Sequence, residues 1–70
     1  MSRYAVVIEQ AEGNLSAYVP DLPGCVATGR TEAEVRANIA EAVRLQVESL
    51  RAHGEPVPAA CTTTLAVEAG

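Results

Sequence analysis

The chain of 70 residues has room for one domain, and its formal net charge at pH 7 is -4. Its five basic side chains are all arginines, too few for the basic patches that neutralise phosphates, so direct nucleic-acid binding is not expected. The chain is 49% hydrophobic but lacks Phe and Trp, so its core must be built from smaller side chains that bury less area each. We therefore expect marginal stability, supplemented by assembly into a homo-oligomer, a dimer or a tetramer.

The two cysteines, Cys25 and Cys61, and the single histidine, His53, lack the spacing of a metal site or a redox motif. The N-terminal residues do not have the pattern of a secretory signal, so we expect free thiols in a reducing cytoplasm. No apolar run reaches the roughly 18 residues of a membrane span, and no membrane association is expected. The sequence thus predicts a cytoplasmic protein without metal or cofactor.

A hairpin is predicted at the N-terminus. Residues 4–8 are apolar on both faces and rich in β-branched side chains, which indicates a central strand buried on two sides. Polar turn residues follow at positions 12–14, and residues 15–19 then alternate with a period of two. These two segments are expected to pair as antiparallel strands.

Two prolines then flank Asp21-Leu22 and rule out a helix interior or a central strand, so a rigid corner is predicted. Pro23-Gly24 has the residue order of a type II turn, in which glycine takes a positive φ at the third position. A third strand over residues 25–30 continues the antiparallel meander.

A long helix follows the third strand. Thr31 and Glu34 form a capping box, so the helix begins at about Glu32. Gly54, with prolines close behind, ends it near His53. Spacings of three and four give one apolar stripe along the helix: Val35, Ile39, Ala42, Val43, Gln46, Val47 and Leu50.

Residues 62–67 are predicted to form a fourth strand. A right-handed crossover would lay this strand parallel to the first, on its open side, giving the sheet order 3-2-1-4 in an α+β fold. The single helix covers one face, which leaves Val7, Tyr18 and Val26, or their opposite-face neighbours, uncovered. We expect a partner, either another copy or a different protein, to cover that face.

These features together resemble the HicB-like antitoxin domain. The segments that carry the resemblance are residues 4–9, 18–25, 28–29, Thr31, Glu34, Asn38, 41–42 and Leu50, with Gly54 and Pro58 behind. The resemblance spans nearly the whole chain, residues 1–70, as a single domain. It implies a truncated ribonuclease-H-like fold, in agreement with the β-β-β-α-β order.

The resemblance implies an antitoxin rather than an enzyme. Such a protein binds a small basic HicA-type toxin, an mRNA-cleaving ribonuclease, and neutralises it by direct contact. Many family members carry a C-terminal DNA-binding module. This sequence stops at Gly70, just after the predicted fourth strand, so we expect no C-terminal DNA-binding domain.

The proline corner and the strand before it are the candidate partner-binding site, because a rigid backbone loses little entropy on docking. The candidate residues are Tyr18, Pro20, Asp21, Leu22, Pro23 and Gly24. No catalytic and no metal-binding residue is predicted.

Two other functions fit the sequence. One is an orphan HicB-like domain that acts as a homo-oligomeric structural or ligand-binding module. The other is a degenerate nuclease built on Glu9, Asp21, Glu34 and Glu41. We disfavour the nuclease, because two-metal sites need several convergent acidic residues, whereas Glu34 is explained by capping and Asp21 as an acceptor within the turn.

Overall fold

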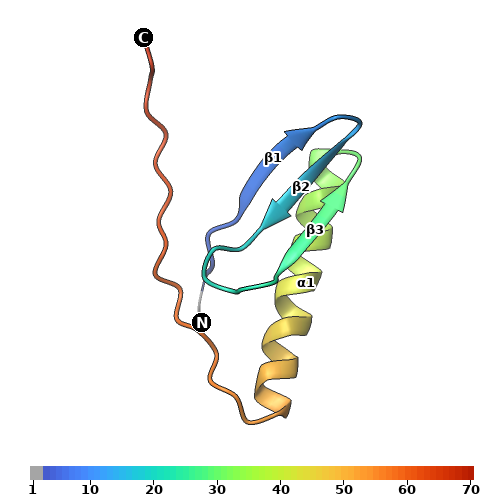
Figure 1. The fold of residues 1–70 in the computed structure, drawn as a ribbon, viewed down its shortest axis with the longest axis vertical. Coiled ribbons are helices and arrows are strands. Elements are labelled where there is room, and N and C mark those ends of the chain that lie inside the picture. The colour runs from blue at the N-terminus through green and yellow to red at the C-terminus, as the bar shows by residue number, and fades with distance from the viewer. Residues whose placement is uncertain (1–2) are drawn as a thin grey trace.

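The computed structural model describes residues 3–70. Its elements are β1 (Val7–Ala11), β2 (Asn14–Tyr18), β3 (Val26–Gly29) and α1 (Glu32–Ala52). The strands form an antiparallel sheet in the order β1-β2-β3, and α1 packs across one face and extends beyond the sheet (Figure 1). The predicted α+β class and the order of these four elements are confirmed.

The hairpin has a two-residue turn at Glu12-Gly13, where Gly13 has a φ of 79°, a value that a side chain would disfavour. Its register runs from the Ala11–Asn14 pair to the Val7–Tyr18 pair. The chain leaves β2 after Tyr18, so residues 4–6 have no strand to pair with and β1 starts later than predicted. In this sheet β1 is an edge strand and β2 is central, whereas the sequence indicated a central first strand.

The corner between β2 and β3 consists of two consecutive turns. The amide of Leu22 donates to the carbonyl of Val19, and the amide of Cys25 donates to the carbonyl of Leu22, both at 3.1 Å. Gly24 has a φ of 80°, the value that a type II turn requires at this position. The amide of Val19 also donates to the carbonyl of Cys25, which closes the loop. The predicted rigid corner is confirmed.

The start of α1 lies directly against the end of β3. The amide of Glu34 donates to Oγ1 of Thr31, and the Glu34 carboxylate accepts from the amide of Arg30, one residue before the expected partner. A Cβ at Gly29 would lie 2.6 Å from the backbone nitrogen of Val35, so only glycine permits this approach. The predicted N-terminal cap of the helix is confirmed.

The helix ends in a Schellman motif. The amide of Glu55 donates to the carbonyl of Leu50, and the amide of Gly54 donates to that of Arg51. Gly54 has a φ of 68°, which a side chain would disfavour. The predicted stop after His53 is therefore also correct.

The core is small and lies between β2, the corner and the first half of α1. Leu22 and Val35 are completely buried. The buried set is Ala17, Val19, Leu22, Cys25, Val35 and Ile39. The later residues of the helical stripe are only partly buried, because the sheet does not extend beneath them.

Residues 55–70 run as an extended tail with no helix or strand. In this structure the sheet has three strands where four were predicted, because residues 62–67 are not paired with β1. The tail is held instead at two points: the Tyr4 hydroxyl donates to the carbonyl of Pro58 at 2.6 Å, and Asp21 accepts from Cys61 and Thr62. Beyond these anchors the tail lies on the β1 side of the sheet but apart from it (Figure 1).

Candidate partner-binding site

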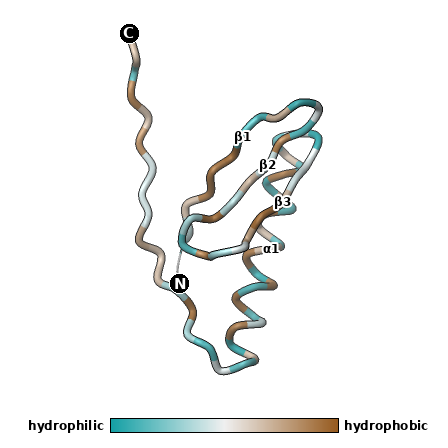
Figure 2. The backbone as a smooth tube through the Cα atoms, in the orientation of Figure 1, coloured by the Kyte–Doolittle hydropathy of each residue, from teal (hydrophilic) through white to brown (hydrophobic). Residues whose placement is uncertain are grey.

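The sheet face opposite α1 carries an uncovered apolar row. Val7 pairs with Tyr18, and Tyr18 pairs with Val26, so these three side chains lie side by side across the strands. Tyr18 is 41% exposed and Val26 is 65% exposed, whereas the neighbouring Ala17 faces the helix and is buried. Apolar segments of β1 and of the start of β3 lie at the same end of the sheet (Figure 2). The predicted uncovered face is confirmed.

The corner adds exposed backbone and ring surface beside this row. Pro20, Pro23 and Gly24 are exposed, and Tyr18 and Val26 flank the corner at its base. Gln46 of α1 donates a side-chain hydrogen bond to the carbonyl of Pro23 at 3.1 Å. The corner is thus braced by the helix on one side while its prolines face solvent.

Leu22, another candidate contact residue, has no exposed surface. Its side chain lies in the core and supports the corner from within. The exposed part of the candidate site therefore consists of Tyr18, Pro20, Pro23 and Gly24, with Asp21 half-buried.

The sequence suggested that Asp21 accepts hydrogen bonds within its own turn, but in the structure its hydrogen-bond donors lie in the tail. Its carboxylate accepts from the hydroxyl of Thr62 at 2.7 Å, from the Thr62 and Cys61 amides at 2.9 Å each, and from the Cys61 thiol. The hydrogen bonds from Thr62, and then those from Cys61, lower the pKa of Asp21 from 3.8 to about 2. The same contact raises the pKa of the Cys61 thiol, because an adjacent carboxylate disfavours the thiolate.

No sequence signal marked this contact, because it joins residues 40 positions apart. An aspartate between two prolines is explained locally, and the tail contains no cation that would have indicated a partner. Thr62 donates two hydrogen bonds to Asp21, but from the sequence it was predicted only to lie in a strand.

In the described part of the chain, the acidic residues weighed for a two-metal site have other partners or lie apart from any cluster of metal ligands. Within residues 3–70 no group of three or more His, Cys, Asp or Glu side chains could hold a metal ion. Glu34 is occupied by the amide of Arg30, and Glu41 pairs with Arg44 on the outer face of α1.

Across residues 3–70 no helix has the length and apolarity needed to cross a membrane. The long helix α1 carries charged side chains along its outer face, including ion pairs of Arg44 with Glu41 and Glu48.

Comparison with known proteins gives a family and several relatives. The family model for the HicB-like antitoxin of bacterial toxin-antitoxin systems matches residues 4–69. The UPF0150 protein Ta0767 of Thermoplasma acidophilum is 44% identical over 57 residues, which are 80% of this chain and 83% of the relative. The UPF0150 protein ssr1765 of Synechocystis is 43% identical over 56 residues, 79% of this chain and 71% of the relative.

An uncharacterised 14.9 kDa protein of Haemophilus phage HP1 is 33% identical over 55 residues, which are 79% of this chain but 41% of the phage protein. No solved structure matches the chain. The family match spans the hairpin, the corner, the helix and the tail. The chain therefore belongs to the HicB-like antitoxin family.

Proposed function

We propose that this protein is an antitoxin that binds a small, basic, mRNA-cleaving toxin of the HicA type and neutralises it by direct contact, without catalysis of its own. Because mRNA is the target of such a toxin, the antitoxin would act in the cytoplasm. The observation that carries the proposal is the match to the HicB-like antitoxin family over residues 4–69.

The uncovered face of the sheet is the proposed contact surface. Tyr18 offers an aromatic ring with a hydroxyl, a residue type that is frequent at the centre of protein interfaces. Val26 adds exposed apolar area beside it. The exposed corner residues, Pro20, Pro23 and Gly24, would form the adjoining edge, and their fixed backbone would lose little entropy on binding.

Charge supports a basic partner. The chain has a net charge of -4, and Glu9 lies on β1, exposed, two residues along the strand from Val7 and hence on the same face. The negative net charge, with the Glu9 carboxylate beside the apolar row, would steer a basic toxin towards this face and disfavour acidic proteins.

We further propose that residues 62–67 form a strand beside β1 in the working protein, which would complete the order 3-2-1-4 and a truncated ribonuclease-H-like sheet. The support is the unpaired outer edge of β1 and the run of β-branched residues in the tail.

The proposal is tested by tagging the protein in its native host and identifying by mass spectrometry what co-purifies with it. The expected result is a small basic protein in stoichiometric amount. Recovery of the chain only with itself, at several expression levels, would contradict the proposal and favour an orphan homo-oligomeric module.

Two matched variants test whether the basic partner binds the uncovered face of the sheet. Val26→Lys adds a positive charge to the uncovered face, and Leu45→Lys makes the same change at an exposed leucine of α1. Lysine is well tolerated on an edge strand such as β3, so Val26→Lys should fold. We expect Val26→Lys to lose the basic partner and Leu45→Lys to retain it. Equal retention by both variants would exclude the uncovered face.

A further inference from the structure

A polar row crosses the uncovered face of the sheet next to the apolar row. Glu9 of β1 pairs with Ser16 of β2, and Ser16 pairs with Thr28 of β3, so these three residues lie side by side across the strands. Each lies two residues along its strand from a member of the apolar row, which places both rows on the same face. The two rows are roughly 7 Å apart, because each residue of a strand adds about 3.4 Å. We call Glu9, Ser16 and Thr28 the acceptor row.

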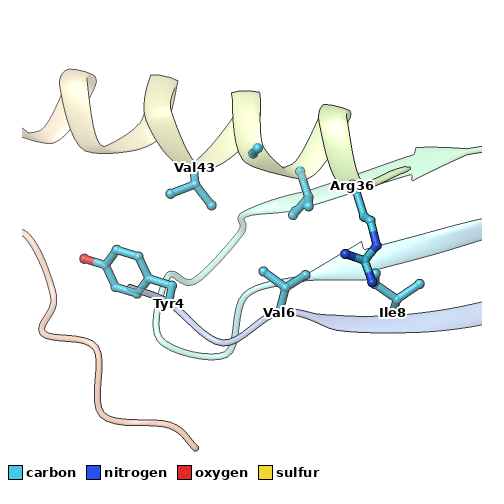
Figure 3. Close-up of a pocket in the computed structure, with 7 residues that line it drawn as sticks. Tyr4, Val6, Ile8, Arg36 and Val43 are labelled. Atoms are coloured by element: carbon cyan, nitrogen blue, oxygen red, sulfur yellow. The ribbon is translucent and has the colours of Figure 1, made fainter. Parts of the chain in front are cut away.

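The direction of the acceptor row follows from its neighbours on the strands. Figure 3 shows Val6 and Ile8 on the β1 side of a groove that lies beneath α1. Ala17, which pairs with Ile8, is buried on the same side. Because successive side chains of a strand point to opposite faces, Glu9 points away from the groove. The acceptor row therefore faces away from the helix, together with the apolar row.

The side chains of the acceptor row have hydrogen-bonding capacity that the described chain does not use. Glu9 and Thr28 are exposed, and Ser16 is half-buried. The ion pairs among residues 3–70 all lie on α1, and within this range none of the three side chains of the row forms a hydrogen bond. An ionised carboxylate accepts through two oxygens, and each hydroxyl oxygen accepts as well. A carboxylate beside two hydroxyls suits a cationic group with several N–H donors.

We propose that the acceptor row receives one basic side chain of the toxin, a lysine or an arginine, an inference that rests on the proposed antitoxin function. The ammonium or guanidinium group would donate to the Glu9 carboxylate and to a neighbouring hydroxyl. The toxin's apolar contact would then lie over Tyr18, roughly 7 Å from this basic group. A toxin with a neutral or acidic side chain at this place would leave the Glu9 carboxylate desolvated and unpaired, so the row selects among apolar surfaces that could cover the face.

This short-range contact can be separated from the long-range attraction of the net charge. Charges at the rim of an interface mainly change the association rate, whereas loss of a desolvated charge pair mainly raises the dissociation rate. Glu12 is also exposed and acidic, but it lies in the hairpin turn beyond β1 and outside the acceptor row. Glu9→Gln and Glu12→Gln therefore change the net charge equally and differ in their position relative to the row.

The first test measures both rate constants by surface plasmon resonance, with the basic protein that co-purifies with the chain. We expect Glu9→Gln to raise the dissociation rate at least about 10-fold and Glu12→Gln to leave it within about twofold. The double variant Ser16→Ala/Thr28→Ala removes no charge and should raise it about threefold. Glutamine has the shape of glutamate, so both glutamine variants should fold, which circular dichroism checks. Equal dissociation rates for Glu9→Gln and Glu12→Gln would overturn the proposal.

The second test identifies the basic side chain by double-mutant cycles. Each lysine and arginine of the basic protein is replaced by alanine, and its binding to the wild-type chain and to Glu9→Gln is compared. We expect one of these substitutions to weaken binding to the wild-type chain about 10-fold and to have little effect in Glu9→Gln. Additive effects at every basic residue would overturn the proposal and leave the antitoxin function in place. A wild-type chain that binds no basic protein would overturn the proposed function and this inference with it.

Discussion

The corner at residues 19–25 and the tail at residues 55–70 both contain two prolines and both leave the sheet, but they are stabilised in different ways. The corner is closed by three backbone hydrogen bonds and buries Val19, Leu22 and Cys25. The tail is fixed at Tyr4 and Asp21, and its apolar side chains are exposed. In this molecule the corner is fixed by side chains that enter the core, whereas the tail is fixed by hydrogen bonds at its two anchors.

Leucine-to-alanine substitutions in the corner and in the tail should differ most in their effect on the free energy of unfolding. Leu22→Ala removes a completely buried side chain and should cost about 2 to 5 kcal/mol of unfolding free energy. Leu65→Ala should change it by less than about 0.5 kcal/mol at a dilution where the chain is monomeric. Urea denaturation followed by circular dichroism measures both. Equal losses would mean that the tail belongs to the core of the monomer.

Gly29→Ala tests the contact that positions the helix behind the corner. The new Cβ would lie 2.6 Å from the Val35 nitrogen and 2.9 Å from its Cα, so the backbone of β3 or α1 must shift. We expect a loss of about 1 to 3 kcal/mol by denaturation. The neighbouring, exposed Thr28→Ala is the control. If Gly29→Ala lowers the free energy of unfolding no more than Thr28→Ala does, the backbones of β3 and α1 can move apart at little cost.

Threonine-to-alanine substitutions at the helix start and in the tail should also differ in their effect on stability, but by a smaller amount. Thr31→Ala removes the oxygen that accepts from the amide of Glu34 at the helix start and should cost about 1 kcal/mol. Thr63→Ala, in the tail, removes no hydrogen bond to any residue in the described range 3–70 and should leave the unfolding midpoint unchanged. A shift with Thr63→Ala equal to that with Thr31→Ala would reveal a tail contact within the monomer.

The anchor at Asp21 should be released by acid. Its pKa of about 2 in the folded chain lies below the ordinary 3.8, so its contribution is complete above pH 3.8 and is lost as pH falls towards 2. The amide NMR signals of Cys61 and Thr62 should titrate in this window, and those of Val35 should not. Asp21→Asn should speed hydrogen exchange at these two tail amides even at neutral pH. Tail amides that stay protected in this variant would contradict the anchor.

Local signals account for the parts of the fold that the sequence predicted well. Thr31 with Glu34, Gly54, and Pro23-Gly24 each act within a few residues, so their turns and caps could be placed. The uncovered row at Tyr18 followed from strand alternation and the presence of one helix. The exposure of this row was thus predictable, whereas its contact with a partner stays a prediction.

The remaining differences depend on contacts between distant residues. Asp21 was explained within its turn, but its partners lie 40 residues away and carry no charge. The burial of Leu22 could not be distinguished from exposure, because a hydrophobic residue between two turns suits a core or an interface equally. A strand over residues 62–67 was predicted from their β-branched composition, but strand formation needs a pairing edge, and in this structure these residues are unpaired.

The most direct test of the proposed antitoxin is an RNA-cleavage assay with the basic protein that co-purifies, titrated with this chain. The account predicts that cleavage is abolished at stoichiometric amounts of wild-type protein and of Leu45→Lys, and that Val26→Lys requires a large excess. Undiminished cleavage in the presence of excess, folded wild-type chain would contradict neutralisation by direct contact.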